Sequence, residues 1–491
     1  MSVRIDDMAG IEGGAIAALI DEHESLVRPR LETLWRYYRN PVESAGGATG
    51  AGAERRLAQR AGLPSRLVGR TPGDDDRAGD REVVIENDIA WRIHTMVDFM
   101  FGKPLRILST ARDDATRERV ERILDAVWEA SGGVALLQDF ALLGHVYGHA
   151  DLVLRIDEAG LRLLGRRGAP PDAGEIAEHV RIELVEPTRG VPVLNPNDYR
   201  RFDAYVVHFE RDLNEVERTR GVGVFGRGGA TPTRRRRSVV TEVITGEVRR
   251  VYEDGEVVEE SAITLTAGRV PVVHVQNVSQ PFRYSGLSEV EPLIPLQYEL
   301  NTRLSDRASR VTLQSFKMYL AKGIEGFERM PVGPGRVWST DNPEASVQAF
   351  GGDASSPSEE AHVKEVRDAL DKTSGVPPLA TGVVQGRVGN LSSANALKIT
   401  LVGLLGKTER KRVTYGRGIA DACAIVLGAL DAAGALELDE RDRGVRLEWP
   451  DPLPSDVLDE TLAAKRKVEL GVPAERVLDE LGYQPSDAGV V

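Results

Sequence analysis

The architecture of this chain is decided by two stretches, GLSEVEPLIPLQYELNTRLSDRASRVTLQSF (residues 286–316) and SPSEEAHVKEVRDALDKTSGVPP (residues 356–378). Apolar residues recur in both at the spacing of one helical face, so each predicts a long helix. Prolines stand near the start of the first, and regular helix is expected from Pro295 to about Ser315, a length of about 30 Å. The apolar stripes predicted for helix packing and oligomerisation are Leu296, Leu300, Leu304, Ala308 and Val311 in the first helix, and Val363, Val366 and Leu370 in the second.

Capping signals mark the start of both helices. Ser288 and Glu291 have the spacing of a capping box, in which each side chain satisfies a free backbone N–H of the first turn. Ser356 is the predicted N-cap of the second helix, with Pro357 at the first helical position and Glu359 completing the box.

The residues between the two helices read as a small strand module. KMYLAKG, RVWSTDN and SVQAF have the composition of short strands and are joined by glycine- and proline-rich turns. We therefore predict a helical hairpin that pairs 292–315 with 357–373 and carries 318–352 at its tip. A stalk of this kind suits a part of an assembly better than an active site.

Elsewhere the chain alternates between helix-rich and strand-rich regions, which predicts an α+β fold. Helices are expected over 15–39, 87–102, 116–129 and 134–147, with Leu26 on the apolar side of the first. The segments ADLVLRI and LRLLG, joined by DEAG, predict a β-hairpin, and later alternating segments predict further strands and a meander. A long helix is expected after Ser392, with a kink among Gly403, Gly406, Gly416 and Gly418. Two short helices, 456–470 and 473–482, would meet at Gly471, whereas residues 41–82 read as a glycine- and arginine-rich arm.

Composition narrows the function. The chain has 491 residues, a net charge of −13 and one cysteine, Cys423, whose apolar neighbours predict a buried thiol. A single cysteine excludes a disulfide framework and a multi-cysteine zinc site.

No signal peptide and no uninterrupted apolar run of the ~18 residues that span a bilayer are found, so no membrane partner is predicted. The acidic balance opposes tight, nonspecific binding of nucleic acid, although it is compatible with a protein that surrounds DNA.

Each motif that could carry chemistry fails in its context. GVGVFG (221–226) lacks the preceding strand and following helix of a dinucleotide fingerprint, and GLLGKT has Leu401 where a phosphate-binding loop needs glycine. His145 and His149 have i, i+4 spacing but no third ligand, so packing or hydrogen bonding is expected. The Arg234–Arg237 run is expected in a solvated loop, with contact to nucleic acid or an acidic partner as the alternative. We predict no catalytic residue, metal or cofactor.

The order of these parts resembles the portal proteins of tailed bacteriophages, the head-to-tail connectors of the siphophage-like type through which the genome is packaged. The resemblance is carried by LETLWRYYRN, NDIAWRIHTMVDFMFGKPL, ALLGHVYGHADLVLRI, YSGLSEVEPLIPLQYELNTRLSDRASR, SGVPP, NLSSANALKITLVGLLGKTERK and WPDPLPSD. It covers most of the chain.

The resemblance implies a division of the chain into the parts of a portal subunit. These are an N-terminal helix and arm (1–86), a wing of helices and then strands (87–285), stem helices (286–317 and 353–375) around a clip (318–352), a tunnel loop (376–392), a long kinked wing helix (393–434) and a crown (435–491). The glycine-rich tunnel loop, hinged by Gly382, would line the DNA channel at its narrowest point. The lining residues implied are Val384, Gln385, Gly386, Arg387, Val388, Gly389 and Asn390.

The resemblance also implies a function and partners. The chain would form a ring, usually a dodecamer, at one vertex of the viral capsid and act in genome packaging and ejection. Its partners would be double-stranded DNA, the large terminase, a head-completion adaptor, and the major capsid and scaffolding proteins. It would reside in the virion and, before assembly, in the host cytoplasm. A scaffold protein unrelated to phage, or a nucleic-acid-processing enzyme such as a motor subunit or nuclease, remains the alternative.

Overall fold

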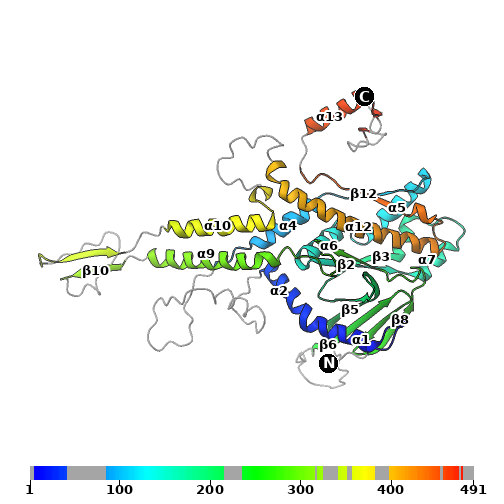
Figure 1. The fold of residues 1–491 in the computed structure, drawn as a ribbon, viewed down its shortest axis with the longest axis horizontal. Coiled ribbons are helices and arrows are strands. Elements are labelled where there is room, and N and C mark those ends of the chain that lie inside the picture. Colours follow the sequence, from blue (N-terminus) through cyan, green and yellow to red (C-terminus); the bar gives the residue numbers. More distant parts are fainter. Residues whose placement is uncertain are drawn as a thin grey trace, which may run out of the picture.

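The computed structural model describes residues 5–40, 84–214, 235–315, 318–323, 341–350, 356–381, 398–453, 457–474 and 477–478. It is a mixed α+β protein in which one pair of helices projects far from the rest (Figure 1). We call the projecting helices α9 and α10 the stem, the two-stranded sheet beyond them the tip sheet, and the remaining described residues the body.

Four helices build the main core of the body: α4 (Asp88–Phe101), α5 (Asp114–Ala130), α6 (Gly133–Tyr147) and α12 (Val402–Ala432). The helices predicted over 87–102 and 116–129 are confirmed, and Ile93 and Met96 of α4 and Val120 and Ile123 of α5 are buried. Cys423 is also fully buried, as predicted, and receives a hydrogen bond from Trp128 Nε1.

A three-stranded antiparallel sheet, ordered β3-β2-β9, packs against these helices. Its strands are β2 (His149–Ile156), β3 (Val180–Val185) and β9 (Val272–Gln276). A Cβ atom at Gly418 of α12 would lie 2.2 Å from Val275 Cγ2, so this glycine lets the helix approach the sheet.

The predicted β-hairpin at 150–165 is wrong in its second half. Residues Glu158–Gly165 form helix α7, followed by α8 (Ala173–His179). The Asp157 carboxylate accepts a hydrogen bond from the Gly160 backbone N–H and caps α7. An N-cap aspartate followed by a leucine pair that can be buried on one helical side therefore outweighs the turn signal of DEAG.

A five-stranded antiparallel meander, β4-β5-β6-β7-β8, forms the second sheet. Its strands are β4 (Gly190–Asn195), β5 (Asp198–Asn214), β6 (Arg235–Thr245), β7 (Val248–Glu253) and β8 (Glu256–Ala262). The meander is confirmed. The loop expected at Arg234–Arg237 is wrong for its last three residues, because they begin β6, and Arg237 lies within ion-pair distance of Glu210 on β5.

Residues 13–39 are helical throughout, but the helix is not uniform. It comprises α1 (Gly13–Glu22), a π-helical turn (His23–Val27) and α2 (Arg28–Arg39), which ends at Asn40 with φ of 38°. Ile16 and Ile20 pack with Val206 and Val243 of the meander. Leu26, expected on the apolar side, is 68% exposed, because the wider π turn shifts its position around the helix axis.

The C-terminal part returns to the body. Helix α12 continues through all four glycines at which a kink was expected, and the chain is interrupted at Leu401 instead. Helix α12 is long and apolar enough to cross a membrane by those criteria alone, but 56% of its most apolar window is buried inside the protein. Strand β12 (Val445–Glu448) pairs with β1 (Arg106–Ser109), and α13 (Val457–Glu469) follows. Gly471, with φ of 91°, ends that helix as predicted.

Several predicted features lie outside the described residues. They are the arm at 41–82, the GVGVFG segment, the strand read from RVWSTDN except its last two residues, the tunnel loop from residue 382 onward with all seven lining residues, the Ser392 cap and most of the helix at 473–482. The first residues of that loop are described, and Pro378–Thr381 form a 3-10 turn.

Candidate functional site: the stem and its junction with the body

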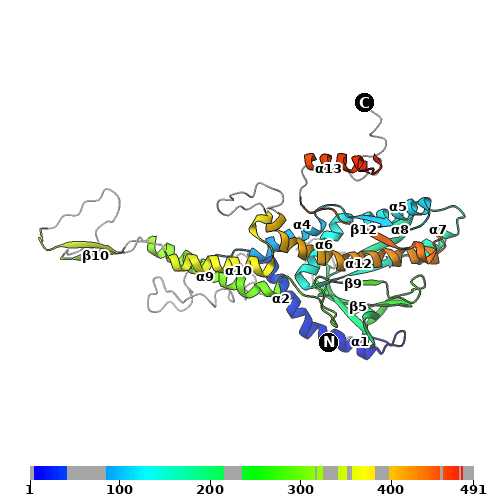
Figure 2. The ribbon, with the colours of Figure 1, turned by 45° about the horizontal axis from the view of Figure 1, so that its top comes forward.

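The stem consists of α9 (Ile294–Ser315) and α10 (Pro357–Ser374), which run side by side in both views (Figures 1 and 2). A short 3-10 turn, Glu291–Leu293, leads into α9. The tip sheet, β10 (Met318–Lys322) paired antiparallel with β11 (Ser346–Phe350), lies at the far end. The predicted pairing of the two helices, with strands at their tip, is therefore present in the structure.

The apolar stripe of the stem is buried most deeply beside the body. Leu300 is fully buried, as are Leu370 and, nearly so, Val363 and Val366. Leu296 and Leu304 are partly buried against the same cluster. Further out Ala308 is half-buried, and Val311 is 40% exposed within the single chain. Each fully buried aliphatic side chain contributes about 1.5–3 kcal/mol, so apolar packing fixes the base of the stem and weakens towards its tip.

Ion pairs also join the two stem helices, both beside the buried part of the stripe and further out. Arg310 of α9 pairs with Glu359 of α10. Glu299 accepts hydrogen bonds from His362 Nε2 at 2.9 Å and Arg303 Nε at 2.7 Å, and these two contacts lower its pKa. The pairs are partly exposed, so they set the register of the helices more than they stabilise them.

The first predicted capping box is half present, and neither side-chain hydrogen bond of the second is formed. Ser288 Oγ accepts from the backbone N–H groups of Val290 and Glu291, but the Glu291 carboxylate binds Arg30 of α2 instead of returning to Ser288. Ser356 occupies the N-cap position without a side-chain hydrogen bond. In each case an arginine from another helix binds the glutamate that the local motif would use: Arg30 binds Glu291, and Arg310 binds Glu359.

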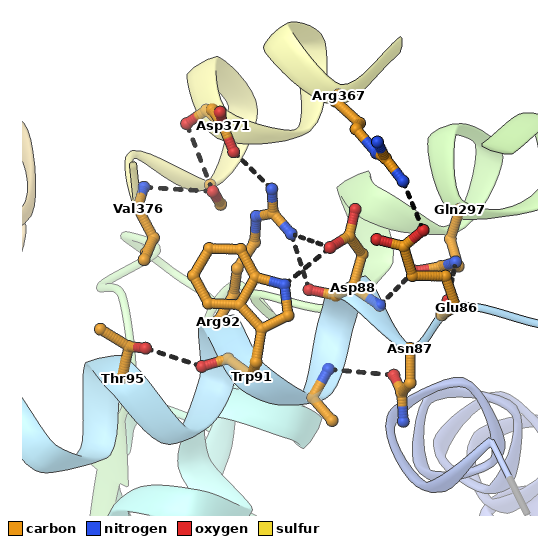
Figure 3. Close-up of polar contacts among 12 residues, drawn as sticks. Glu86, Asn87, Asp88, Trp91, Arg92, Thr95, Gln297, Arg367, Asp371 and Val376 are labelled. Atoms are coloured by element: carbon orange, nitrogen blue, oxygen red, sulfur yellow. Dashed lines mark hydrogen bonds and ion pairs between the residues drawn. The ribbon is translucent and has the colours of Figure 1, made fainter. Parts of the chain in front are cut away.

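A buried arginine joins the stem to the body. Arg92 of α4 is 1% exposed and reaches Asp371 of α10, with 2.5 Å between Nη2 and Oδ1, while its Nη1 contacts Asp88 (Figure 3). Trp91 places its ring 4.2 Å from the Arg92 guanidinium carbon and donates its indole N–H to Asp88. Burial raises the pKa of Asp371 against the opposing effect of Arg92. We call these residues the junction.

A polar face of α9 holds the segment that precedes α4. Gln297 Oε1 accepts from the Asp88 N–H, Asn301 Oδ1 accepts from the Glu86 N–H, and Ser305 Oγ accepts from the Val84 N–H, each at 3.0 Å. These side chains stand at i, i+4 and i+8, so they form one row along the helix. The row gives partners to three backbone N–H groups, of which that of Asp88 belongs to a buried residue. Arg367 of α10 adds an ion pair to Glu86 (Figure 3).

A second buried ionic cluster joins α12 to the end of α10. Lys407 Nζ donates to Glu289 Oε2 at 2.5 Å and to the Ser374 carbonyl oxygen at 2.8 Å, and Lys411 Nζ lies 2.9 Å from Glu289 Oε1. The two lysines outweigh the effect of burial and lower the pKa of Glu289 to about 2. Burial lowers the pKa of Lys411 to about 8 despite its pairing with Glu289. The end of α10 and the start of α12, which precede and follow the predicted tunnel loop, are therefore held together by this cluster.

The two histidines pack inside the body, as predicted. His145 is fully buried and its Nδ1 lies 2.5 Å from the Ala141 carbonyl oxygen; burial and nearby Lys411 hold its pKa well below the usual value. Burial lowers the pKa of His149 to about 4, and its ring packs edge-on against Tyr284. Within the described ranges, no group of three or more His, Cys, Asp or Glu side chains could hold a metal ion.

Sequence reasoning identified the apolar stripes and missed the junction. Arg92 sits on the apolar helix 87–102, and its partner Asp371 is 279 residues away, so no local pattern connects them. The polar row had a readable signal, because three amide or hydroxyl residues at i, i+4 and i+8 beside an apolar stripe indicate a face that receives another segment.

The fold and this site together define a structural protein: an α+β body, a stem locked to it by buried ion pairs, and a small sheet at the far end. The sequence matches the family described as phage portal protein, SPP1 Gp6-like, over residues 17–481, and the chain belongs to that family. It is accordingly a portal protein, a structural and not an enzymatic component of phage-like particles.

Comparisons with individual proteins are more distant. No curated protein matches the sequence. A solved chain described as "Neck of empty GTA particle computed with C6 symmetry" is 14% identical with a TM-score of 0.46, over 80% of this chain and 90% of that one. A chain from "Virion of native gene transfer agent (GTA) particle" is 13% identical with a TM-score of 0.43, over 90% of this chain and 97% of that one.

Proposed function

We propose that this chain assembles into a ring, of twelve copies, at one vertex of the capsid of a phage or gene-transfer particle. The ring is the conduit through which double-stranded DNA is packaged and ejected. The observation that carries the proposal is the stem, a helical pair fastened to the body at one end and bearing the tip sheet at the other, in a chain of the portal family. A ring requires each subunit to offer two different faces to its neighbours, and the stem and the broad body offer such faces.

Each part of the subunit has a proposed role. The tip sheet, within the clip 318–352, is the contact for the large terminase during packaging and for the head-completion adaptor afterwards. The body, as the wing, contacts the major capsid and scaffolding proteins. The C-terminal part, 435–491, contributes the crown through the helices that leave the body. The residues between α10 and α12, including 384–390, line the channel.

The charge of the chain supports a conduit that does not hold its cargo tightly. Net charge is −13, and phosphate affinity requires lysine and arginine contacts that release counterions. Within the proposed tunnel residues 384–390, Arg387 carries the only charge. DNA is therefore expected to pass with few strong contacts.

Two experiments test the proposal. An electron micrograph of the purified protein, viewed end-on, should show closed rings with a central hole, and a protein that stays monomeric at all concentrations would refute the ring. Deletion of 383–390 should leave ring assembly intact while impairing packaging or retention of DNA. Full packaging by that variant would exclude the tunnel role of the loop.

The family match does not support the two alternative functions, an unrelated scaffold protein and a nucleic-acid-processing enzyme. A scaffold unrelated to phage is excluded by the family match over 17–481. A nucleic-acid-processing enzyme is excluded because the family is structural. Purified protein should therefore hydrolyse neither ATP nor DNA.

A further inference from the structure

A cavity of about 550 Å³ lies between α12, β9, the start of β5 and the loop after β9. We call it the arginine pocket, because five arginines line it and Asp421 is its one lining carboxylate. All five are exposed: Arg200, Arg201, Arg269, Arg283 and Arg417. His274 also lines the cavity, and its Nδ1 lies 2.6 Å from the buried Asp151.

These arginines differ from others on the body. Arg155 and Arg249 both pair with Glu242, whereas none of the five pocket arginines makes an ion pair with a carboxylate in the part of the chain that the structure describes. Positive charge is concentrated here in a chain that carries a net charge of −13. A cluster of guanidinium groups that form no ion pair within the described part of the subunit can bind an anionic partner outside it.

The rim of the pocket indicates a protein partner. Phe282 is 85% exposed with φ of 63°, and its ring centroid lies 6.0 Å from that of Tyr199. A left-handed backbone at a bulky residue is strained, so the fold holds this ring outward at a cost. Arginine and aromatic residues without lysine are the composition of the centres of protein–protein contacts. A DNA duplex, whose major groove alone is about 12 Å wide, is too large to enter such a cavity.

The same chain carries a surface of complementary charge. Residues 5–27 contain six acidic residues and no lysine or arginine. Asp21 and Glu22 are exposed at the end of α1 and make no ion pair with any described residue. The π-helical turn that follows leaves Leu26 68% exposed. We call Asp21, Glu22 and Leu26 the acidic face; π-helical turns of this kind are often found at functional sites.

The two surfaces are placed for contact between copies. Helices α1 and α12 lie on opposite sides of β5 in both views (Figures 1 and 2). A subunit with a cationic pocket on one side and an acidic, partly apolar face on another can bind its neighbour head to tail, as a closed ring requires.

We infer that the arginine pocket of one subunit receives the acidic face of the adjacent copy. The carboxylates of Asp21 and Glu22 meet the guanidinium groups of Arg269 and Arg417, and Leu26 packs against Phe282. Guanidinium–carboxylate contacts are charge-assisted and often bidentate, so they fix orientation as well as adding affinity. This inference rests on the proposed ring and identifies one contact that closes it.

A charge swap tests the contact. The variant Arg269→Glu/Arg417→Glu and, separately, Asp21→Arg/Glu22→Arg should each raise the protein concentration needed for half-assembly by at least about tenfold. Combining all four substitutions restores opposite charges across the contact and should recover most of the assembly. Native mass spectrometry and sedimentation measure the ring, and circular dichroism checks the fold. Arg166→Glu/Arg441→Glu, which reverses two exposed arginines outside the pocket, is the matched control and should assemble normally.

The outcomes separate this inference from the proposed function. If the unmodified protein forms no ring, both fail. If it forms rings and the pocket variant assembles equally well, or if the four-residue combination does not recover assembly, only the pocket contact is wrong. Inorganic pyrophosphate serves as a probe for the competing role: pyrophosphate binding that is lost in Arg269→Glu/Arg417→Glu, with ring assembly unaffected, would make the pocket a phosphate site and overturn the inference.

Discussion

The junction and the arginine pocket use the same residue type in opposite ways. Arg92 in the junction is 1% exposed, with two aspartates and an indole ring around it. Arg269 and Arg417 in the pocket are exposed and lie beside Asp421 as the one carboxylate of the lining. A buried guanidinium group has lost its water and therefore needs charged or polar partners inside the same subunit. An exposed guanidinium group remains hydrated and is free to bind a partner on another subunit. The comparison indicates that paired arginines hold the subunit together, and we propose that the unpaired ones hold subunits to each other.

The largest expected effect concerns the apolar base on which the junction depends. Leu300→Asp places a charge at a fully buried position of the stem and should lower the free energy of unfolding by about 4 kcal/mol. Val311→Asp, at a position 40% exposed in the single chain, should lower it by less than about 1 kcal/mol. Chemical denaturation measures both. If both variants lost the same unfolding free energy, the burial of each residue in the single chain would not determine how much it contributes to the stability of the stem.

For Leu304→Asp we expect a loss of unfolding free energy between those of Leu300→Asp and Val311→Asp, because Leu304 is partly buried against the main core. We expect Leu300→Asp and Leu304→Asp both to prevent ring assembly, since a charge in the stripe disturbs the face on which the stem packs. Size-exclusion chromatography or electron microscopy would detect the loss. Normal rings from both variants would contradict the role assigned to the stripe.

The next effect tests the junction itself. Arg92→Ala leaves Asp88 and Asp371 facing each other without a cation and should cost about 3 kcal/mol. Arg307→Ala, at an exposed arginine of α9, should cost less than about 0.5 kcal/mol. Thermal unfolding of the two variants provides the comparison. If Arg92→Ala behaves like its control, the buried pair does not join the stem to the body.

The second buried cluster predicts a pH dependence. The pKa of Glu289 is about 2 in the folded protein against an ordinary value of 4.5, so the folded state binds fewer protons than the unfolded state between these values. Stability from this group is therefore complete above pH 4.5 and is lost as pH falls towards 2, to a total of about 3 kcal/mol. Glu289→Gln should remove this part of the acid sensitivity, which shows as a smaller difference in unfolding free energy between pH 5 and pH 3. An unchanged difference would contradict the assignment.

The smallest expected effect on monomer stability concerns the arginines of the pocket, which we compare with Arg92 of the junction. Arg269→Ala and Arg417→Ala should each change the unfolding free energy of the monomer by less than about 0.5 kcal/mol, because neither side chain is buried or ion-paired within the described chain. The same variants should weaken assembly. A loss of monomer stability comparable to that of Arg92→Ala would remove the distinction between the two kinds of arginine.

Much of the fold was predictable because it is local. The helical period of Val363, Val366 and Leu370 predicts a buried face, and these residues are buried. The failures were also local in origin. Residues 158–165 carry a turn signal and a helix cap at once, and packing of Leu161 and Leu164 into the core decided for the helix. Leu26 fitted the 3.6-residue period that a π turn interrupts.

The sequence by itself determined the hairpin of long helices, the strand module between them, the order of helices and strands in the body, and the resemblance to portal proteins, because periodicity and caps act over a few residues. Only the tertiary structure decided which charges meet. Arg92 with Asp371, Lys407 with Glu289, and the gathering of arginines around one pocket each bring together residues far apart in the chain. The physical reason is that burial and Coulomb interaction depend on distance in space, and no pattern along the sequence records that distance.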